Sequence, residues 1–244
     1  MEKTAIVTGA SRGIGAAVAR ALAAQGLRVA VCCHENREKA EAVCAQIRAA
    51  GGTAAPFAVN VADAASVAAL FGAVTAVLGT PLVLVNNAGI ARQKLFTDLT
   101  EADWDEMMGV CAKGTFLCCR AALPGMIRAR WGRIVNISSM WGQTGASCEV
   151  DYSAAKAAVI GLTKALAKEE GPSGVTVNCV APGAVETDML AGFSPAEKAA
   201  LAEETPLCRL GTPEDIAAAA AFLCTEKAGF ITGQILGVNG GFVI

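Results

Sequence analysis

The chain has 244 residues, of which 54% are hydrophobic, 17% are charged and 26 are glycine. This apolar content excludes a disordered protein, because disordered chains are polar. A formal net charge of −2 gives no basic surface, so we expect no nucleic-acid partner. The length suits one domain over residues 1–244, because no linker or low-complexity run divides the sequence.

Ten cysteines are spread along the chain without any Cys-x-x-Cys pair. Most lie in apolar runs, where a reduced thiol packs as a small hydrophobe. The single histidine, His34, excludes a Ser-His triad and a site of several histidines, so we expect no metal. The amino-terminal residues 1–10 include no segment that would direct secretion. These features predict a cytoplasmic protein.

Short apolar runs alternate with helical patterns from one end of the chain to the other. The runs predict strands at 4–9, 28–33, 53–59, 81–86, 133–138, 175–180 and 234–239. The segments between them predict helices at 13–25, 36–50, 66–78, 102–129, 152–170 and 213–224, and a polar, lid-like stretch at 186–212. This order predicts an α/β fold, a Rossmann-type doubly wound parallel sheet of seven strands with helices on both faces. Such sheets bind ligands at the carboxyl ends of their strands.

Residues 64–91 carry no charged side chain and are long enough to suggest a membrane span. A Gly-Thr-Pro turn at 79–81 and the pair Asn86-Asn87 interrupt this run. We therefore interpret it as a buried helix, a turn and a buried strand, and expect no membrane association. The thin polar face of the helix indicates burial by a partner subunit.

A glycine-rich turn, TGASRGIG at residues 8–15, follows the first strand and opens into a helix. Its glycines permit a tight turn and a close approach of the backbone to a pyrophosphate at the helix N-terminus. The spacing is GxxxGxG rather than GxGxxG, but its place in the first βαβ unit favours dinucleotide binding. We expect cofactor contacts from Gly9, Ser11, Arg12, Gly13, Ile14 and Gly15.

The end of the second strand indicates which dinucleotide binds. An NAD site usually has a carboxylate there for the ribose 2′-hydroxyl, whereas this strand ends in Cys32-Cys33. Without that acid a 2′-phosphate meets no repulsion, and the planar guanidinium of Arg12 can pair with it. We therefore predict NADP(H), with Cys33 beside it. Glu35, two residues beyond the strand, is the observation that favours NAD instead.

Polar residues also follow the next two strands. Asparagines here can simply form turns, but in this fold they also end where the cofactor lies. We expect cofactor contacts after the third strand from Asn60 and Val61, and after the fourth from Asn87, Ala88 and Gly89.

Tyr152, the only tyrosine, and Lys156 are four residues apart in a predicted helix and share one face. A phenol has a pKa of about 10, which an adjacent ammonium lowers toward the range useful for acid catalysis. Ser139 follows the preceding strand, at the edge where open sheets place their chemistry, and can donate to a developing oxyanion. The alternative readings are an exposed helix face for the pair and a turn for the serine.

Five ordered motifs, TGASRGIG, NNAG, Ser139, YSAAK and Pro182-Gly183, resemble the short-chain dehydrogenase/reductase family over the whole chain. The resemblance implies a carbonyl reductase in which Tyr152 protonates the carbonyl oxygen. Lys156 would tune the pKa of Tyr152 and bind the nicotinamide ribose, and Ser139 would orient the carbonyl. The resemblance also implies a homotetramer, and a border to the nicotinamide half of the cofactor formed by Pro182, Gly183, Val185 and Thr187.

One position departs from the family pattern. The family usually has a catalytic asparagine in the long helix before the serine strand, and Cys111, in VCAKGTF, stands there. In the family this position supports a water that links the lysine to solvent. We expect attenuated proton resupply rather than loss of activity, and keep Cys111 as the fourth catalytic position.

Within the family the chain most resembles 3-oxoacyl-[acyl-carrier-protein] reductases, which implies a ketone on an acidic carrier protein. Arg128, Arg130 and Arg133 could form a basic landing patch for that carrier. However, Ser173 stands where that group has a second basic residue.

The segment SSMWGQTGASCEV at 138–150 instead resembles a subgroup that reduces a 5-aminopentanone group on a lysine of elongation factor P. A substrate with a cationic amine would suit an aromatic face and nearby acids, which here are Trp141, Glu149 and Asp151. The sequence does not decide between these two candidate substrates. A third reading, from another class, is a protein that senses NADP(H) without turnover.

Overall fold

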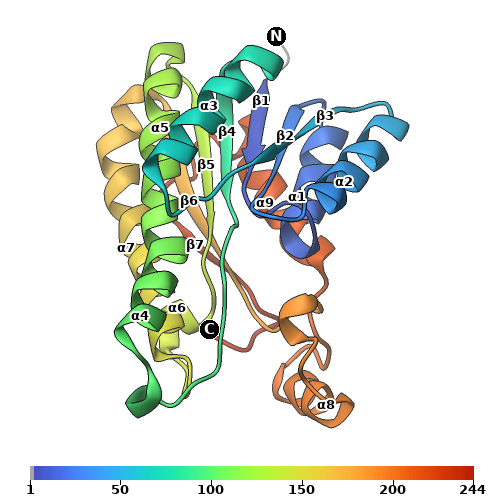
Figure 1. Ribbon diagram of the computed structural model, residues 1–244, viewed down its shortest axis with the longest axis vertical. Helices are drawn as coiled ribbons and strands as arrows, with labels where there is room; N and C mark the ends of the chain where they lie inside the picture. Colours follow the sequence, from blue (N-terminus) through green and yellow to red (C-terminus); the bar gives the residue numbers. More distant parts are fainter. Residues whose placement is uncertain (1–2) are drawn as a thin grey trace.

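Seven parallel strands form one sheet in the order β3-β2-β1-β4-β5-β6-β7 in the computed structural model, which describes residues 3–244 (Figure 1). Met1 and Glu2, part of the segment considered for secretion, lie outside the described residues. The chain winds from β1 outward to β3, then returns to place β4 beside β1. The strands are β1 (Thr4–Val7), β2 (Arg28–Cys33), β3 (Thr53–Ala58), β4 (Pro81–Asn86), β5 (Gly132–Ile137), β6 (Val175–Pro182) and β7 (Ile235–Val238).

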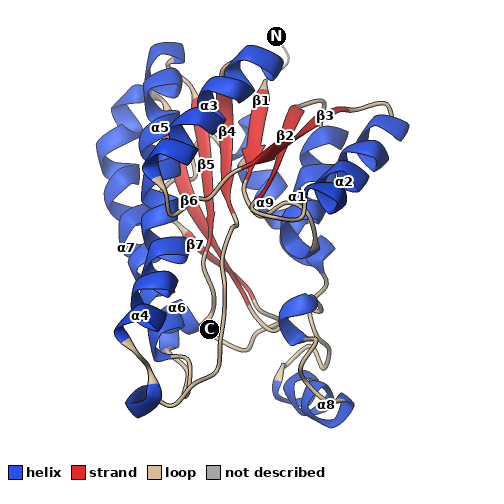
Figure 2. Cartoon of the chain, in the orientation of Figure 1, coloured by secondary structure: helices blue, strands red, loops and turns tan. Residues whose placement is uncertain are grey.

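Helices cover both faces of this sheet (Figures 1 and 2). One face carries α1 (Gly13–Ala24), α2 (Arg37–Ala49) and α9 (Pro213–Leu223), and the other carries α3 (Ala64–Leu78), α5 (Gly114–Ala129) and α7 (Val150–Glu170). Below the carboxyl ends of the strands lie α4 (Glu101–Met107), α6 (Trp141–Thr144) and α8 (Pro195–Glu204). The predicted α/β, doubly wound fold with seven strands is confirmed.

The alternation of side chains along β1 divides the core in two. Ala5 and Val7 pack in the layer of α1, α2 and α9, whereas Ile6 packs in the layer of α3 and α5. All three are 0% exposed. Because both faces are covered, every residue of the strand must be apolar or hydrogen-bonded, which explains why the central strands read as continuous apolar runs. Each fully buried isoleucine or valine contributes about 1.5–3 kcal/mol.

The uncharged run 64–91 forms α3, a turn and β4, as predicted. The buried face of α3 holds Val67, Leu70, Phe71, Val74 and Leu78, whereas Val77 on the opposite side is 63% exposed. Among residues 3–244, the helical stretch Glu101–Ala129 is long and apolar enough to cross a membrane by length and composition alone. In its most apolar window 44% of the residues are buried inside the protein, and buried core helices meet the same criteria.

Three elements differ from prediction, and the first is the short helix α6, where no helix was expected. The helix expected over 102–129 contains a π-helical turn, Met108–Lys113, between α4 and α5. The polar stretch 186–212, expected to be lid-like, contains α8, which begins at a capping box between Ser194 and Glu197. The Ser-Pro-x-Glu start was therefore a helix signal that the polar composition obscured.

Candidate active site

The turn between β1 and α1 has a shape that requires glycine. Gly9 and Gly13 have φ of 62° and 53°, in the left-handed region. A Cβ on Gly15 would lie 2.4 Å from the carbonyl oxygen of Gly9. Arg12, the N-cap of α1, makes no side-chain capping bond, so its side chain leaves the first N–H groups of the helix available to a ligand. This cradle fits the pyrophosphate of a dinucleotide.

Asn87 connects the end of β4 to the cradle. Its Nδ2 donates to the carbonyl oxygens of Thr8 and Gly9, both at 3.0 Å. The Thr8 hydroxyl accepts from the backbone N–H groups of Asn87 and Ala88, again at 3.0 Å. Asn87 therefore holds the shape of the glycine loop, and its direct contact with a cofactor stays a prediction.

The end of β2 presents no acid to the cradle. Cys33 is 2% exposed, and burial raises the pKa of its thiol while Arg37 opposes that shift. The Glu35 side chain is 82% exposed and lies 3.7 Å from His34. The one carboxylate that favoured NAD is thus turned to solvent.

A hollow of about 300 Å³ lies beside the glycine loop. Its charged lining residues are all cations, Arg12, Arg20 and Lys39, and Ser11 and Gly13 also line it. A site with this charge balance favours an anionic group.

Asn60 and Val61 follow β3, as expected. The Asn60 side-chain oxygen accepts from the N–H of Ala62 at 3.0 Å, which forms a turn. Val61 is 7% exposed and packs so closely on Gly114 that a Cβ there would lie 2.8 Å from its methyl group. Their place beside an adenine stays a prediction.

The stretch after β6 approaches the glycine loop from the other side. Pro182 ends β6, and Gly183 is so close to Asn239 that a Cβ would lie 2.8 Å from its Cα. The Thr187 methyl group would be 3.4 Å from a Cβ on Gly13. Val185 is 6% exposed and pairs with Gly211. Thr187 therefore lies beside the glycine loop, and the contact of these four residues with a cofactor stays a prediction.

The neighbour of Thr187 also reaches the loop, because Asp188 Oδ2 lies 3.4 Å from Arg12 Nε. Both side chains are more than half exposed, so this ion pair is weak and can exchange for another anion.

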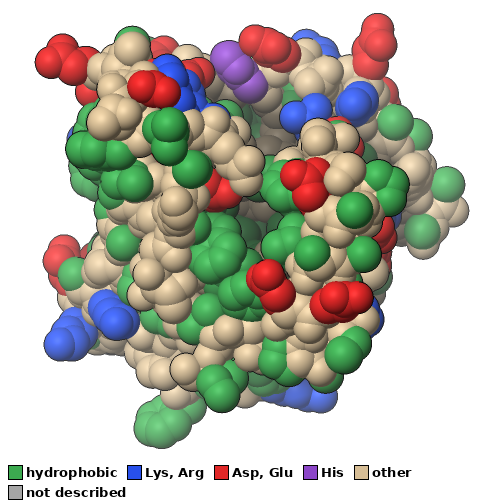
Figure 3. Space-filling view, turned by 90° about the horizontal axis from the view of Figure 1, so that it is seen from below, with side chains coloured by type: hydrophobic (Ala, Val, Ile, Leu, Met, Phe, Trp, Pro, Cys, Tyr) green, Lys and Arg blue, Asp and Glu red, His purple; other side chains and the backbone are tan. Residues whose placement is uncertain are grey.

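Tyr152 and Lys156 lie on one face of α7 and are 8% and 4% exposed. Lys156 Nζ lies 5.6 Å from the centroid of the Tyr152 ring and donates to the carbonyl oxygen of Ile137 at 2.9 Å. The Ser138 hydroxyl donates to the Lys156 carbonyl at 2.8 Å, which ties the end of β5 to α7. Figure 3 shows the face toward which the strands point: it is hollowed, and hydrophobic side chains lie inside the hollow.

Ser139 completes the predicted trio. It is 7% exposed, and its Oγ accepts from the backbone N–H of Trp141 at 3.1 Å. The bond leaves the hydroxyl proton free to be donated toward a carbonyl oxygen. Hydrogen bonding with Ser139 also lowers the pKa of Tyr152.

The net pKa shift of Tyr152 is opposite to the one expected from sequence. Burial raises the pKa of Tyr152, and the Lys156 charge and Ser139 lower it by less. The pKa of Lys156 also lies above its ordinary value. Burial lowers it, but the facing Tyr152, Cys111 and Cys179 raise it more. The free protein therefore holds a protonated phenol beside an ammonium, which is the state that a proton donor needs.

Cys111 occupies the π-helical turn, where it is 1% exposed. Its thiol donates to the carbonyl oxygen of Ile90 at 3.5 Å, a weak bond. A Cβ on Gly89 would lie 3.4 Å from Lys156 Nζ and 3.6 Å from the Cys111 sulfur, so the two groups meet at this glycine. The Cys111 carbonyl accepts from Thr115 Oγ1 at 2.9 Å.

The three predicted substrate residues do not share one environment. Trp141 is partly exposed and packs edge-on against Phe242, with ring centroids 5.6 Å apart. Glu149 is partly buried and accepts from Gln93 Nε2 at 3.4 Å. Burial raises the pKa of Glu149, and its carboxylate raises the pKa of Tyr152. Asp151 is 1% exposed and is turned away from solvent.

The basic landing patch is only partly supported. Arg128 and Arg130 are exposed, but Arg133 is 4% exposed and donates to the carbonyl oxygens of Gly132 and Thr225. All three precede or begin β5, whereas Ser139 follows its carboxyl end. They therefore lie near the amino ends of the strands, whereas the catalytic residues of the same chain lie near the carboxyl ends.

Sequence reasoning missed two groups near the site. Asn86 donates to Asn136 at 2.8 Å, and Asn136 donates to Thr163 at 2.9 Å, which ties β4 and β5 to α7. Arg92 follows the uncharged run and contacts acids on α4 and α7. Its position as the first charge after 28 uncharged residues was an available signal.

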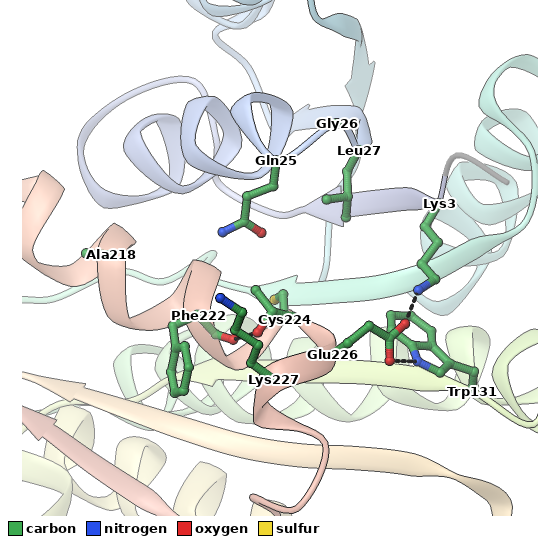
Figure 4. Close-up of a pocket in the computed structure, with 11 residues that line it drawn as sticks. Lys3, Gln25, Gly26, Leu27, Trp131, Ala218, Phe222, Cys224, Glu226 and Lys227 are labelled. Atoms are coloured by element: carbon green, nitrogen blue, oxygen red, sulfur yellow. Dashed lines mark hydrogen bonds and ion pairs between the residues drawn. The ribbon is translucent and has the colours of Figure 1, made fainter.

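A second hollow, of about 810 Å³, lies at the amino edge of the sheet beside the C-terminal ends of α1 and α9 (Figure 4). Its charged side chains are largely satisfied within the wall, because Glu226 accepts from Lys3 and from the Trp131 indole. No catalytic residue lines it. Within residues 3–244, no group of three or more His, Cys, Asp or Glu residues could hold a metal ion.

Comparisons with known proteins identify the family to which the chain belongs. A family model described as enoyl-(acyl carrier protein) reductase matches residues 9–243. The chain is 46% identical to 3-oxoacyl-[acyl-carrier-protein] reductase FabG of Staphylococcus aureus (strain Mu50) over 241 residues, 99% of this chain and 98% of the relative. The chain belongs to the short-chain dehydrogenase/reductase family.

Two other relatives show the breadth of the similarity. FabG of Aquifex aeolicus is 45% identical over 98% of this chain and 96% of its own length. An oxidoreductase of Bacillus subtilis, YmfI, is 44% identical over 99% of both chains, and its name specifies no substrate. As a short-chain dehydrogenase/reductase, this protein is an oxidoreductase that acts on a ketone or its alcohol with a nicotinamide cofactor.

Proposed function

We propose that this protein reduces a ketone to a secondary alcohol with NADPH, and that its substrate is a 3-oxoacyl thioester on an acyl carrier protein. The observation that carries the proposal is the convergence of Ser139, Tyr152 and Lys156 beside the dinucleotide cradle. A phenol and a serine hydroxyl suit a carbonyl oxygen, which gains charge and then a proton during reduction.

Ser139, Tyr152 and Lys156 each have a separate role in the proposed reaction. NADPH, when bound, would supply the hydride that the carbonyl carbon gains, and the cradle residues Gly9, Arg12 and Gly13 would hold it. Ser139 donates a hydrogen bond to the carbonyl oxygen. The Tyr152 O–H bond breaks as its proton passes to that oxygen, giving the alcohol. Lys156 stabilises the resulting phenolate, which regains a proton from solvent.

NADP(H) rather than NAD(H) is supported by charge. The hollow beside the glycine loop is lined by three cations, and Glu35 points to solvent. A 2′-phosphate would replace the exposed Asp188 carboxylate as the partner of Arg12 and form a stronger, multidentate contact. Comparing KM for NADPH and NADH tests this directly.

The 3-oxoacyl substrate is supported by the two FabG relatives, whose names specify it. A second substrate has its own observation. Glu149 places a carboxylate near the proton donor and Trp141 adds an aromatic face, an arrangement that suits the cationic 5-aminopentanone group on elongation factor P. NADPH oxidation with acetoacetyl thioesters against 5-aminopentanonylated elongation factor P separates the two. A Glu149→Gln variant that loses activity only on the aminoketone would favour the second.

Assembly as a cytoplasmic homotetramer completes the proposal. Phe116 on α5 is 45% exposed, and the C-terminal region exposes Phe230 and Ile244 fully and Leu236 to 41%. Apolar side chains of this size are usually covered by a partner. All ten cysteines are free thiols, which fits a reducing compartment. A monomeric mass in solution would contradict the tetramer.

A further inference from the structure

Arg92, on the loop between β4 and α4, presents each nitrogen of its guanidinium to a different carboxylate. Nη1 donates to Asp103 and Nη2 donates to Glu106, both on α4. Nε lies 4.0 Å from Oδ2 of Asp151, in the first turn of α7. A planar fork of donors is suited to hold two elements in a fixed relation, because its donors cannot rotate independently. Arg92 therefore bridges α4 and the start of α7.

Asp151 is the residue that Arg92 meets on α7. It is 1% exposed, and its Oδ1 accepts from the backbone N–H of Tyr152 at 2.8 Å. Its Oδ2 is buried and has no hydrogen-bond partner among the described residues 3–244. A buried carboxylate is costly unless a cation faces it, and Arg92 supplies that cation. The same carboxylate lies at the positive end of the α7 dipole.

The two contacts of Asp151 connect Arg92 to Tyr152, the proposed proton donor. One oxygen holds the Tyr152 backbone and the other faces Arg92, so the position of the first turn of α7 depends on both residues. Tyr152 must present its hydroxyl to the carbonyl between Ser139 and Lys156. A displacement of about 1 Å at such a site can cost about 100-fold in rate.

We propose that Arg92 and Asp151 form a positioning pair that fixes Tyr152 in its catalytic place. Neither side chain contacts the reacting atoms. The sequence predicted that Asp151 contacts substrate. In this proposal it instead fixes the backbone of the proton donor, Tyr152. The pair deepens the proposed function, since it rests on Tyr152 being the proton donor.

The test uses the fact that Tyr152 is the only tyrosine in the chain. Labelling tyrosine with ¹³C at Cζ gives one NMR signal that reports the phenol without any substrate. We expect Asp151→Asn and Arg92→Gln to shift or broaden this signal in the same way. Arg92→Lys keeps the charge but not the planar fork, and we expect the same change. Arg48→Gln, which breaks an exposed ion pair with Glu41 on α2, should leave the signal as in the parent.

Kinetics supply the second readout. We expect Asp151→Asn and Arg92→Gln each to lower kcat by about tenfold or more while KM for ketone and for NADPH changes less than twofold. The double variant should be no slower than the slower single variant, because both act through one contact. An unmoved NMR signal, or losses that multiply in the double variant, would overturn the proposal. If the parent protein reduces no ketone, the proposed function fails, and the NMR signal still decides whether the pair positions Tyr152.

Discussion

Lys156 donates from Nζ to the main-chain carbonyl of Ile137 at 2.9 Å, which anchors the ammonium at the end of β5. The bond fixes a long, flexible side chain in a buried site beside Tyr152. The placement of this charge therefore depends on the sheet, while the placement of the phenol depends on α7.

Replacing Lys156 by Met should lower kcat by about 100-fold or more, because the phenolate formed after proton transfer loses its ammonium. Thermal stability should not fall, since the variant removes a buried charge and keeps an apolar stem of similar size. Turnover and thermal melting check the two parts. Normal turnover in the folded variant would remove Lys156 from the mechanism.

Replacing Cys111 by Asn should raise kcat. An amide donates to the Ile90 carbonyl more strongly than a thiol does, and would better order a water near Lys156. Cys111→Ala, which has no donor, is the matched variant and should be slower than the parent. Equal turnover of the three proteins would show that this position has no catalytic meaning.

Arg12→Ala should raise KM for NADPH by about tenfold or more, because a charge-assisted bond to a phosphate is worth about 1.5–3 kcal/mol. KM for NADH should change little. Arg48→Ala, at a distant exposed pair, serves as the control. An equal loss with both cofactors would show that Arg12 does not read the 2′-phosphate.

Glu149→Gln should move the alkaline limb of the pH profile. Reduction needs Tyr152 protonated, so kcat falls as the pH rises through the pKa of Tyr152. The Glu149 carboxylate raises the pKa of Tyr152, so removing its charge should shift this limb to lower pH. The pH dependence of kcat at saturating NADPH checks the shift. A limb that stays in place or moves upward would contradict the assigned interaction.

The sheet and the catalytic trio were predictable because their signals are local. Strands such as β1 are buried on both faces and must be apolar, and the four-residue spacing of Tyr152 and Lys156 specifies one helix face. The glycine loop was predictable because Gly9 and Gly15 occupy places where a Cβ is strained or excluded.

Other features depend on contacts between distant segments. The π-helical turn adds one residue to a helical turn and leaves no trace in composition, so the setting of Cys111 was not predictable. The orientation of Asp151 depends on Arg92, 59 positions earlier in the sequence. The net pKa shift of Tyr152 depends on how deeply the fold buries the phenol. The spacing to Lys156 alone predicted a lowered pKa, whereas the net pKa is raised.

The most direct test is NADPH consumption with an acetoacetyl thioester, measured for the parent protein and for Tyr152→Phe. We expect the parent to oxidise one NADPH for each 3-hydroxyacyl product formed. The variant should bind NADPH with similar affinity and lose at least about 100-fold in kcat. Binding of NADPH by the parent without consumption across oxoacyl thioesters and aminoketones, or undiminished turnover by Tyr152→Phe, would contradict the account.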